Sequence, residues 1–113
     1  ETVIAEKFHT MLDRDEYNSR MKDFFDCYQL LTKRELDDVS LYDAIKATFD
    51  NRELEYNPKL KLFTAEFVND ANRQMQWKLF LRKIQWKEEL SFNVVMQVVT
   101  DRLKPMAEKY WNK

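Results

Sequence analysis

Apolar side chains recur at steps of three and four residues along most of the chain, the spacing that places them on one face of an α-helix. One stripe covers residues 4–12 and ends at the charged run of residues 13–16. A second covers residues 21–31 and begins after Asn18 and Ser19, either of which can cap the free amides of a helix. Two amphipathic helices are therefore predicted in the first third of the chain.

A third stripe covers residues 41–49. Ser40 is expected to cap this helix, and Asp43, three residues further on, completes the pattern of a capping box. Residues 54–63 (LEYNPKLKLF) show no helical period and contain an Asn-Pro pair, so they are predicted to form a loop.

Two helices are predicted after this loop. Thr64 is expected to cap a short helix, and a longer helix covers about residues 72–86. The apolar side of the longer helix is expected to consist of Met75, Leu79, Phe80 and Ile84.

The last predicted helix begins after Ser91, and its apolar stripe runs through residues 95–110. Pro105 is expected to kink or restart it, because proline has no amide hydrogen to donate. Residues 92–99 (FNVVMQVV) are rich in β-branched side chains and could instead form a strand. A helix is preferred, since the sequence offers no second strand for pairing.

Together these elements predict an all-α protein, with one domain over residues 1–113 built as a bundle of about five helices. The chain has no glycine, which excludes the glycine-rich phosphate loops of dinucleotide-binding folds and P-loop enzymes. Cys27 has no partner for an internal disulfide, and no cysteine or histidine cluster suggests a metal site. A cytoplasmic protein is expected, because no apolar stretch could span a membrane and no signal peptide is visible. The first residue is Glu1 rather than methionine, which suggests a processed chain or a piece of a longer one.

Charge is distributed unevenly along the sequence. Residues 1–53 carry 8 Lys and Arg against 13 Asp and Glu, a net charge of −5. Residues 54–113 carry 11 against 7, a net charge of +4. The two halves could attract each other within the fold, or the basic half could face an anionic partner.

Two carboxylates fall on the side of the second predicted helix that lies opposite its main apolar stripe. At 100° per residue, Asp23 and Asp26 lie together there, beside Cys27. A helix with apolar residues on both sides is expected to be buried on both, and buried carboxylates need partners. Arg20, and Lys7 from the first helix, are the candidates. The pattern is that of a structural salt bridge or, alternatively, of an active centre.

Several motifs are familiar. Residues 5–9 (AEKFH) and 19–26 (SRMKDFFD) resemble two motifs of the AbiEii/AbiGii-type nucleotidyltransferase toxins. Residues 44–52 (AIKATFDNR) are similar to a third motif, and Phe67 with residues 76–81 (QWKLFL) to a fourth. Because the motifs occur in the family's order and cover nearly the whole chain, the sequence resembles the C-terminal helical region of such a toxin.

The resemblance implies a bacterial toxin of a toxin–antitoxin system, associated with phage defence by abortive infection. Such proteins transfer nucleotides from an NTP to RNA, with the tRNA 3′ end as the expected acceptor. In the family a Gly-Ser motif and paired acidic residues of an N-terminal core hold the NTP and Mg²⁺, and this chain has neither motif. The chain alone is therefore expected to be inactive and to bind neither group. The implied partners are that core, a cognate antitoxin and tRNA.

Carried over by position, the resemblance implies that Lys7 and Asp23 are catalytic and that Arg20 and Asp26 support them. A lysine places a point charge where the triphosphate lies. Asp23 would either orient that lysine or help to remove a proton from the attacking hydroxyl. Asp26 is expected to be structural support, paired with Arg20 or with a neighbouring helix.

Lys78, Arg82 and Lys83 belong to a basic group on the predicted helix that also holds Trp77 and Trp86. Basic and aromatic side chains together can bind nucleic acid through phosphate contacts and base stacking. The alternative is a solvated face with both tryptophans in the core. A second class of function also stays open, a non-catalytic helical module that contacts an antitoxin or nucleic acid through the basic half.

Overall fold

The computed structural model describes residues 1–112 and confirms the all-α prediction, since no strand occurs among them. It contains six α-helices within that range rather than about five. None of these helices combines the length and the apolar character that a membrane crossing requires. The elements are α1 (Thr2–Arg14), the 3₁₀ turn η1 (Asp15–Tyr17), α2 (Met21–Lys33), α3 (Asp38–Arg52), α4 (Ala65–Asn69), α5 (Ala71–Lys83) and α6 (Phe92–Trp111).

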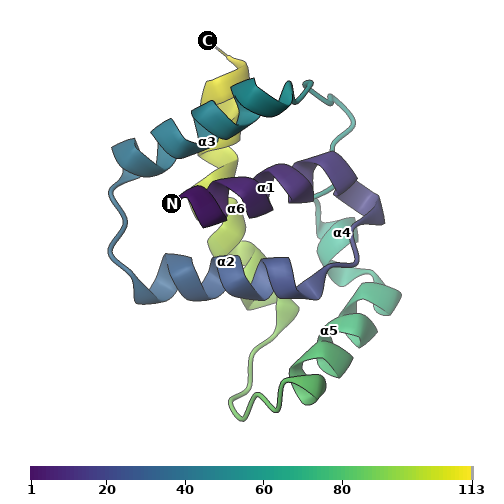
Figure 1. Ribbon diagram of the computed structural model, residues 1–113. Coiled ribbons are helices and arrows are strands. Elements are labelled where there is room, and N and C mark those ends of the chain that lie inside the picture. Colours follow the sequence, from purple (N-terminus) through teal and green to yellow (C-terminus); the bar gives the residue numbers. More distant parts are fainter. Residues whose placement is uncertain (113) are drawn as a thin grey trace.

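Three helices form a layer that a fourth crosses. Figure 1 shows α1 between α3 and α2, with α6 running behind all three at a steep angle. In agreement with that view, α1 packs against α2 and α3, and α6 packs against α2, α3 and α4. The helix α5 lies at one end of the molecule, where it packs on α4 and α2.

Aromatic side chains fill the space between this layer and α6. Phe24 of α2 and Phe92 of α6 are fully buried and meet edge to face, with ring centroids 5.4 Å apart. Phe49 of α3 meets Tyr110 of α6 in the same way at 5.1 Å. Burying a phenylalanine stabilises the fold by about 1.5–3 kcal/mol, so these contacts hold α6 firmly across the layer.

The predicted helix starts are confirmed where a single capping residue was available. The side chains of Thr64 and Ser91 accept hydrogen bonds from the first turns of α4 and α6. The prediction that Ser40 caps α3 was wrong, because the cap lies three residues earlier. Asp37 caps it, accepting hydrogen bonds from the Ser40 amide (3.0 Å) and hydroxyl (2.9 Å). A carboxylate accepts stronger hydrogen bonds than a hydroxyl does, so Asp37 rather than Ser40 determines where α3 begins.

The last helix is confirmed as a helix and not a strand. It runs from Phe92 to Trp111 without restarting at Pro105, which lies inside it. Its buried face carries Val95, Val99, Leu103, Met106 and Tyr110, the stripe predicted from the sequence.

The helix α5 differs most from its prediction. It ends at Lys83 rather than near Trp86. Met75 and Leu79, expected in the core, are 55% and 51% exposed, and Ile84 is also exposed. Of the four residues predicted for the apolar side, Phe80 packs against the core as expected, together with Leu81, and the core side centres on Trp77, which is buried.

The loop of residues 54–63 is confirmed and is held in place by Asp15. Its carboxylate accepts hydrogen bonds from the backbone amides of Lys61 (2.9 Å) and Leu62 (2.8 Å). The chain has no glycine, and within residues 1–112 three residues adopt positive φ angles, of which Asp15 is one with φ 47°. The remaining two are Glu53 and Gln85, each just beyond the end of a helix.

Candidate active site

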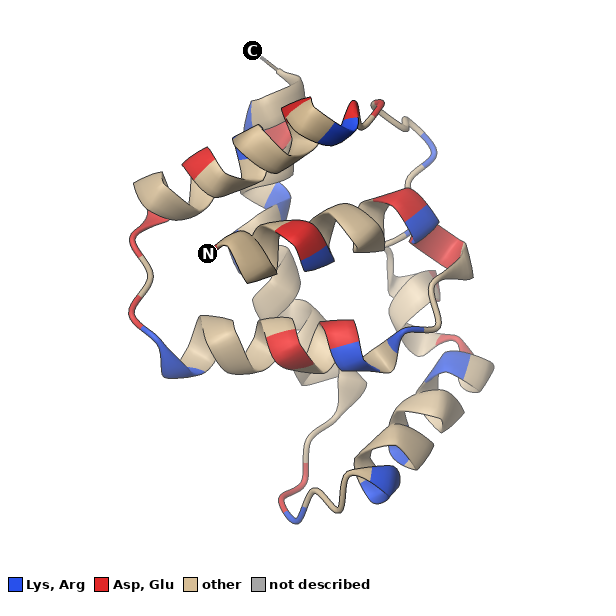
Figure 2. Cartoon of the chain, in the orientation of Figure 1, with Lys and Arg blue, Asp and Glu red and all other residues tan. Residues whose placement is uncertain are grey.

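Lys7 lies on the edge of α1 that faces α2. The neighbouring positions on the helix, Ile4, Phe8 and Met11, are buried, and they fix the rotation of α1 about its axis. The side chain of Lys7 is 21% exposed, so most of its stem is covered by protein while the ammonium stays near the surface. Figure 2 shows charged bands of both signs on the neighbouring stretches of α1 and α2.

Asp23 lies in the first turn of α2, and its side chain is 3% exposed. Its Oδ1 accepts a hydrogen bond from Lys7 Nζ at 3.0 Å. Its Oδ2 lies 3.0 Å from Arg20 Nε in an ion pair whose angle is not that of a hydrogen bond. The predicted contacts of Asp23 with Lys7 and Arg20 are therefore both confirmed.

Asp26 lies one turn further along α2 and shares Lys7 with Asp23. Its Oδ2 is 3.1 Å from Lys7 Nζ and 2.6 Å from Lys22 Nζ. Of the two partners expected for Asp26, the neighbouring helix is confirmed and Arg20 is not. We call the five side chains the Lys7 cluster: Lys7, Arg20, Lys22, Asp23 and Asp26.

The contacts within the cluster keep Lys7 and Asp26 charged. Burial alone would lower the pKa of Lys7, but its hydrogen bonds to Asp23 and Asp26 and their negative charges raise it above the ordinary value. Burial would raise the pKa of Asp26, but hydrogen bonds from Lys22 and Lys7 lower it overall. Lys7 is therefore an ammonium, and Asp26 a carboxylate, across the neutral pH range.

A groove of about 340 Å³ lies above Lys7 and Asp23. Lys7 Nζ has three hydrogens, and two are directed at the carboxylates of Asp23 and Asp26. One N–H remains for a ligand. The groove could therefore hold an anionic group against Lys7 and Arg20. Its lining consists of Thr2, Val3, Glu6, Lys7, Thr10, Arg20 and Asp23.

The carboxylates of the cluster do not form a metal site. Within residues 1–112, no group of three or more His, Cys, Asp or Glu side chains is placed to hold a metal ion. Asp23 and Asp26 already contact the ammonium and guanidinium groups of the cluster. A divalent cation there would be repelled by those groups, so the residues present do not fit Mg²⁺.

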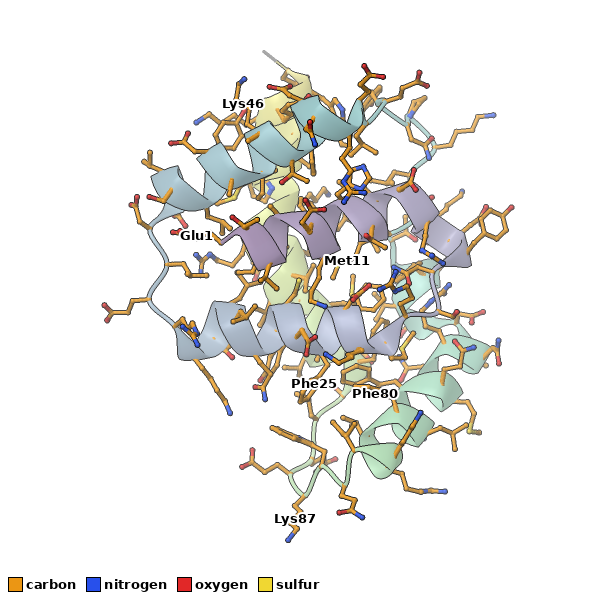
Figure 3. All side chains as sticks on the ribbon, viewed as in Figure 1. Glu1, Met11, Phe25, Lys46, Phe80 and Lys87 are labelled. Atoms are coloured by element: carbon orange, nitrogen blue, oxygen red, sulfur yellow. The ribbon has the colours of Figure 1, made fainter. Side chains whose placement is uncertain are left out.

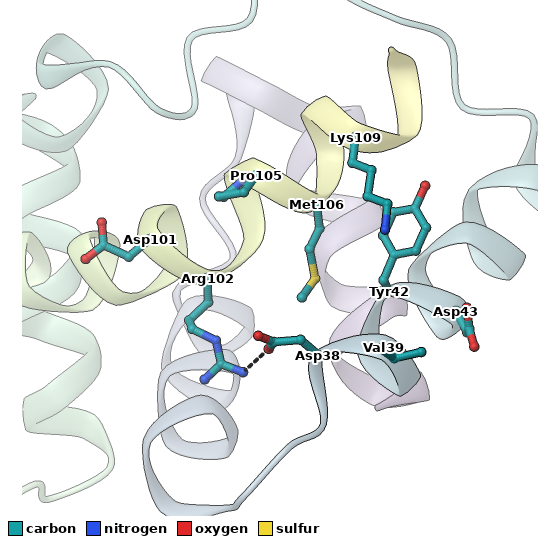
Figure 4. A pocket seen from close by; sticks show the side chains of 9 residues that line it. All are labelled: Asp38, Val39, Tyr42, Asp43, Asp101, Arg102, Pro105, Met106 and Lys109. Atoms are coloured by element: carbon teal, nitrogen blue, oxygen red, sulfur yellow. Dashed lines mark hydrogen bonds and ion pairs between the residues drawn. The ribbon is translucent and has the colours of Figure 1, made fainter. Parts of the chain in front are cut away.

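A second hollow, of about 530 Å³, lies between α3 and α6 and contains none of the predicted site residues. Figure 4 shows its lining, with Arg102 paired to Asp38 at 3.0 Å. The Lys109 ammonium lies over the Tyr42 ring, 4.3 Å from its centroid. The cations of this hollow are thus already engaged within the fold.

The basic residues predicted to contact nucleic acid lie far along the chain from the cluster, on α5. Lys78, Arg82 and Lys83 are all exposed. Of the two tryptophans expected beside them, Trp77 belongs to the core and Trp86 is partly buried. Trp77 is 2% exposed and donates its indole N–H to the Leu90 carbonyl at 2.9 Å, and Trp86 packs edge-on against Phe25.

Two contacts of the candidate site were missed from the sequence. Lys22 precedes Asp26 by four residues, a spacing that brings side chains together on a helix and that could have identified the pair. Glu6, in the groove lining, pairs with Arg52 of α3 at 2.6 Å. No local signal indicates that second pair, because its residues are 46 positions apart.

The fold and the cluster define a helical domain in which two carboxylates hold a lysine at the base of a groove. A family model described as the nucleotidyl transferase AbiEii toxin of a type IV toxin–antitoxin system matches residues 1–98. The chain belongs to this family, which confirms the resemblance drawn from its motifs and implies an antitoxin as a partner. Comparisons with curated proteins and with solved structures find no match.

Proposed function

We propose that this chain supplies Lys7 and Asp23 to the active site of a nucleotidyl transferase that adds nucleotides from an NTP to RNA, with the tRNA 3′ end as acceptor. Family membership supports the reaction type. The observation that carries the role of the two residues is the 3.0 Å hydrogen bond between them at the base of a groove.

In this reaction a hydroxyl of the RNA gives up its proton to solvent as its oxygen attacks the α-phosphorus. A new P–O bond forms, and pyrophosphate leaves with the electrons of the broken P–O bond. Negative charge on the phosphate oxygens has to be compensated. The free N–H of Lys7 can donate to one of those oxygens, and Arg20, half exposed in the same groove, can add a second positive charge.

Of the two roles open to Asp23, its surroundings favour that of orienting Lys7. Protein covers the Oδ2 atom completely, and Oδ1 already accepts from Lys7. A substrate hydroxyl therefore cannot reach Oδ2, and at Oδ1 it would have to compete with Lys7. Asp23 is thus a positioning residue, and Asp26 supports it from the next turn of α2.

The remaining parts of the active site belong, in this proposal, to an N-terminal nucleotidyltransferase core of the same protein. That core would bind Mg²⁺ and the nucleotide through its Gly-Ser motif and paired acidic residues. Because the Lys7 cluster does not fit a divalent cation, the 113-residue chain alone should transfer no nucleotide.

The test uses the protein that carries both parts, incubated with tRNA and labelled NTPs. Lys7→Ala should abolish nucleotide addition, and Asp23→Asn should reduce it by about 100-fold, because the lysine is held less firmly in place. Lys46→Ala is the matched control, since Lys46 is also a helical lysine paired with an aspartate, Asp50 of α3. Thermal melts verify that each variant folds. Wild-type activity in both Lys7→Ala and Asp23→Asn would contradict the proposal.

That result would favour the second candidate function, a non-catalytic helical module that contacts an antitoxin or nucleic acid. The observation in its favour is the exposed basic group of Lys78, Arg82 and Lys83 on α5.

A further inference from the structure

The helix α5 has two faces of different kinds. Its inner face carries Trp77 and Phe80, and the Phe80 ring lies 5.6 Å from that of Phe25 on α2. Figure 3 shows Phe25 and Phe80 close together between the two helices. The outer face presents five exposed side chains three or four residues apart, which we call the α5 outer face: Met75, Lys78, Leu79, Arg82 and Lys83.

The centre of the α5 outer face is aliphatic. Met75 and Leu79 are one helical turn apart and are 55% and 51% exposed, so together they present an apolar strip to water. About half of each side chain is thus open to solvent in the described part of the chain, residues 1–112. A helix with apolar residues on both sides usually has both sides covered, and here only one is.

The border of this strip is positively charged. Residues Ala71–Lys83 include four basic residues and no acidic one, and Figure 2 shows blue bands but no red ones on α5. Lys78, Arg82 and Lys83 make no ion pair with another described residue, whereas the basic residues of the Lys7 cluster all do. Asp70, the nearest acidic residue before the helix, is its cap and accepts from the Arg73 amide at 2.8 Å.

We infer that the α5 outer face binds an acidic amphipathic helix of a partner protein. Aliphatic residues of such a helix would cover Met75 and Leu79, and its carboxylates would pair with the cations on either side. This is the common arrangement in which a helix presents residues at positions i, i+3, i+4 and i+7 to an apolar strip. Charge complementarity would set the orientation and speed the encounter. The inference does not depend on nucleotidyl transfer.

The observations favour a protein over RNA as the occupant. Non-specific binding of single-stranded RNA combines phosphate contacts with bases stacked on aromatic rings. The α5 outer face offers no ring, because Trp77 is buried and Trp86 packs on Phe25. An RNA backbone would contact the cations and leave Met75 and Leu79 in water.

The test measures binding of the 113-residue chain to a fluorescent synthetic peptide by anisotropy. The peptide is a helix of about 18 residues, with leucines at i, i+3, i+4 and i+7 flanked by glutamates. The comparison probes are a scrambled peptide of the same composition and a single-stranded RNA of about 20 nucleotides. Circular dichroism verifies that every variant folds.

We expect the patterned peptide to bind at least about tenfold more tightly than the scrambled one. Both Leu79→Ser and the double variant Lys78→Glu/Arg82→Glu should weaken it by about tenfold or more. Val94→Ser is the matched control, because Val94 is 49% exposed on α6, and it should leave binding unchanged.

Three results would overturn the inference. One is equal binding of the patterned and scrambled peptides, or binding of neither. Another is loss of peptide binding in Val94→Ser as severe as in Leu79→Ser. The third is tight binding of the RNA that Lys78→Glu/Arg82→Glu abolishes and Leu79→Ser does not, which would assign the face to nucleic acid instead.

Discussion

The carboxylate of Asp15 joins the end of α1 to the loop that precedes α4, and its removal gives a sharp test of the fold. Asp15 is buried, and the two amides that it accepts from belong to Lys61 and Leu62. In Asp15→Ala both amides lose their acceptor. The Lys61 amide belongs to an exposed residue and can bind water, whereas Leu62 is fully buried and its amide cannot.

The expected loss follows from these environments. A hydrogen bond to a charged group contributes about 1.5–3 kcal/mol, and a buried donor left without a partner loses the full amount. With the Leu62 amide dominant, Asp15→Ala should lower the free energy of unfolding by about 2–3 kcal/mol. For a chain of this size each kcal/mol corresponds to about 4 °C, so the melting temperature should fall by about 10 °C.

Urea unfolding and thermal melts followed by circular dichroism measure the loss. Asp13→Ala, which removes an exposed carboxylate two residues earlier, is the control and should change stability by less than about 0.5 kcal/mol. Asp15→Gly should be less destabilising than Asp15→Ala, because φ 47° and ψ −123° suit glycine and strain any other residue. If Asp15→Ala has the same melting temperature as the wild type, the carboxylate of Asp15 does not hold the loop in place.

Two further predictions concern groups whose pKa the fold shifts. Burial raises the pKa of the Cys27 thiol to about 12. Ellman's reagent at pH 8 should therefore leave this thiol unmodified until urea unfolds the chain. Rapid reaction of the folded protein would contradict the burial of Cys27. The hydrogen bond to Asp50, followed by burial, raises the pKa of Tyr110 to about 12 from 10.0. Its contribution to stability should therefore be full below pH 10 and be lost as the pH rises toward 12. Absorbance at 295 nm should show one of the five tyrosines titrating late, and Tyr110→Phe should remove that component; a single midpoint near pH 10 would refute the assignment.

Helices with one clear apolar stripe were predicted well from the sequence. In α6 the buried residues form a single row, so a segment rich in β-branched side chains still indicated a helix. In α5 the period did not identify the inner face, because Met75 and Leu79 form one row while Trp77, Phe80 and Leu81 form another. Only packing against α2 and α4 selects the second row.

The candidate site was only partly predictable from the sequence. The angular position of Asp23 on α2, together with that of Lys7 on α1, indicated their contact before the structure did. The family motifs, not the spacing, assigned them to chemistry. The Asp15 contact with Leu62 could not be predicted, because it joins residues 47 positions apart and depends on how the loop folds back.

The match to the family stops at residue 98, which lies inside α6 (Phe92–Trp111). Val99, Leu103 and Met106, all beyond that point, are buried. The fold of this protein therefore needs residues beyond the last one that the family model matches. A version trimmed at residue 98 would uncover apolar side chains of α3 such as Phe49, which packs on Tyr110 and Trp111, and would be expected to aggregate. Recombinant versions of the domain should continue at least through Trp111.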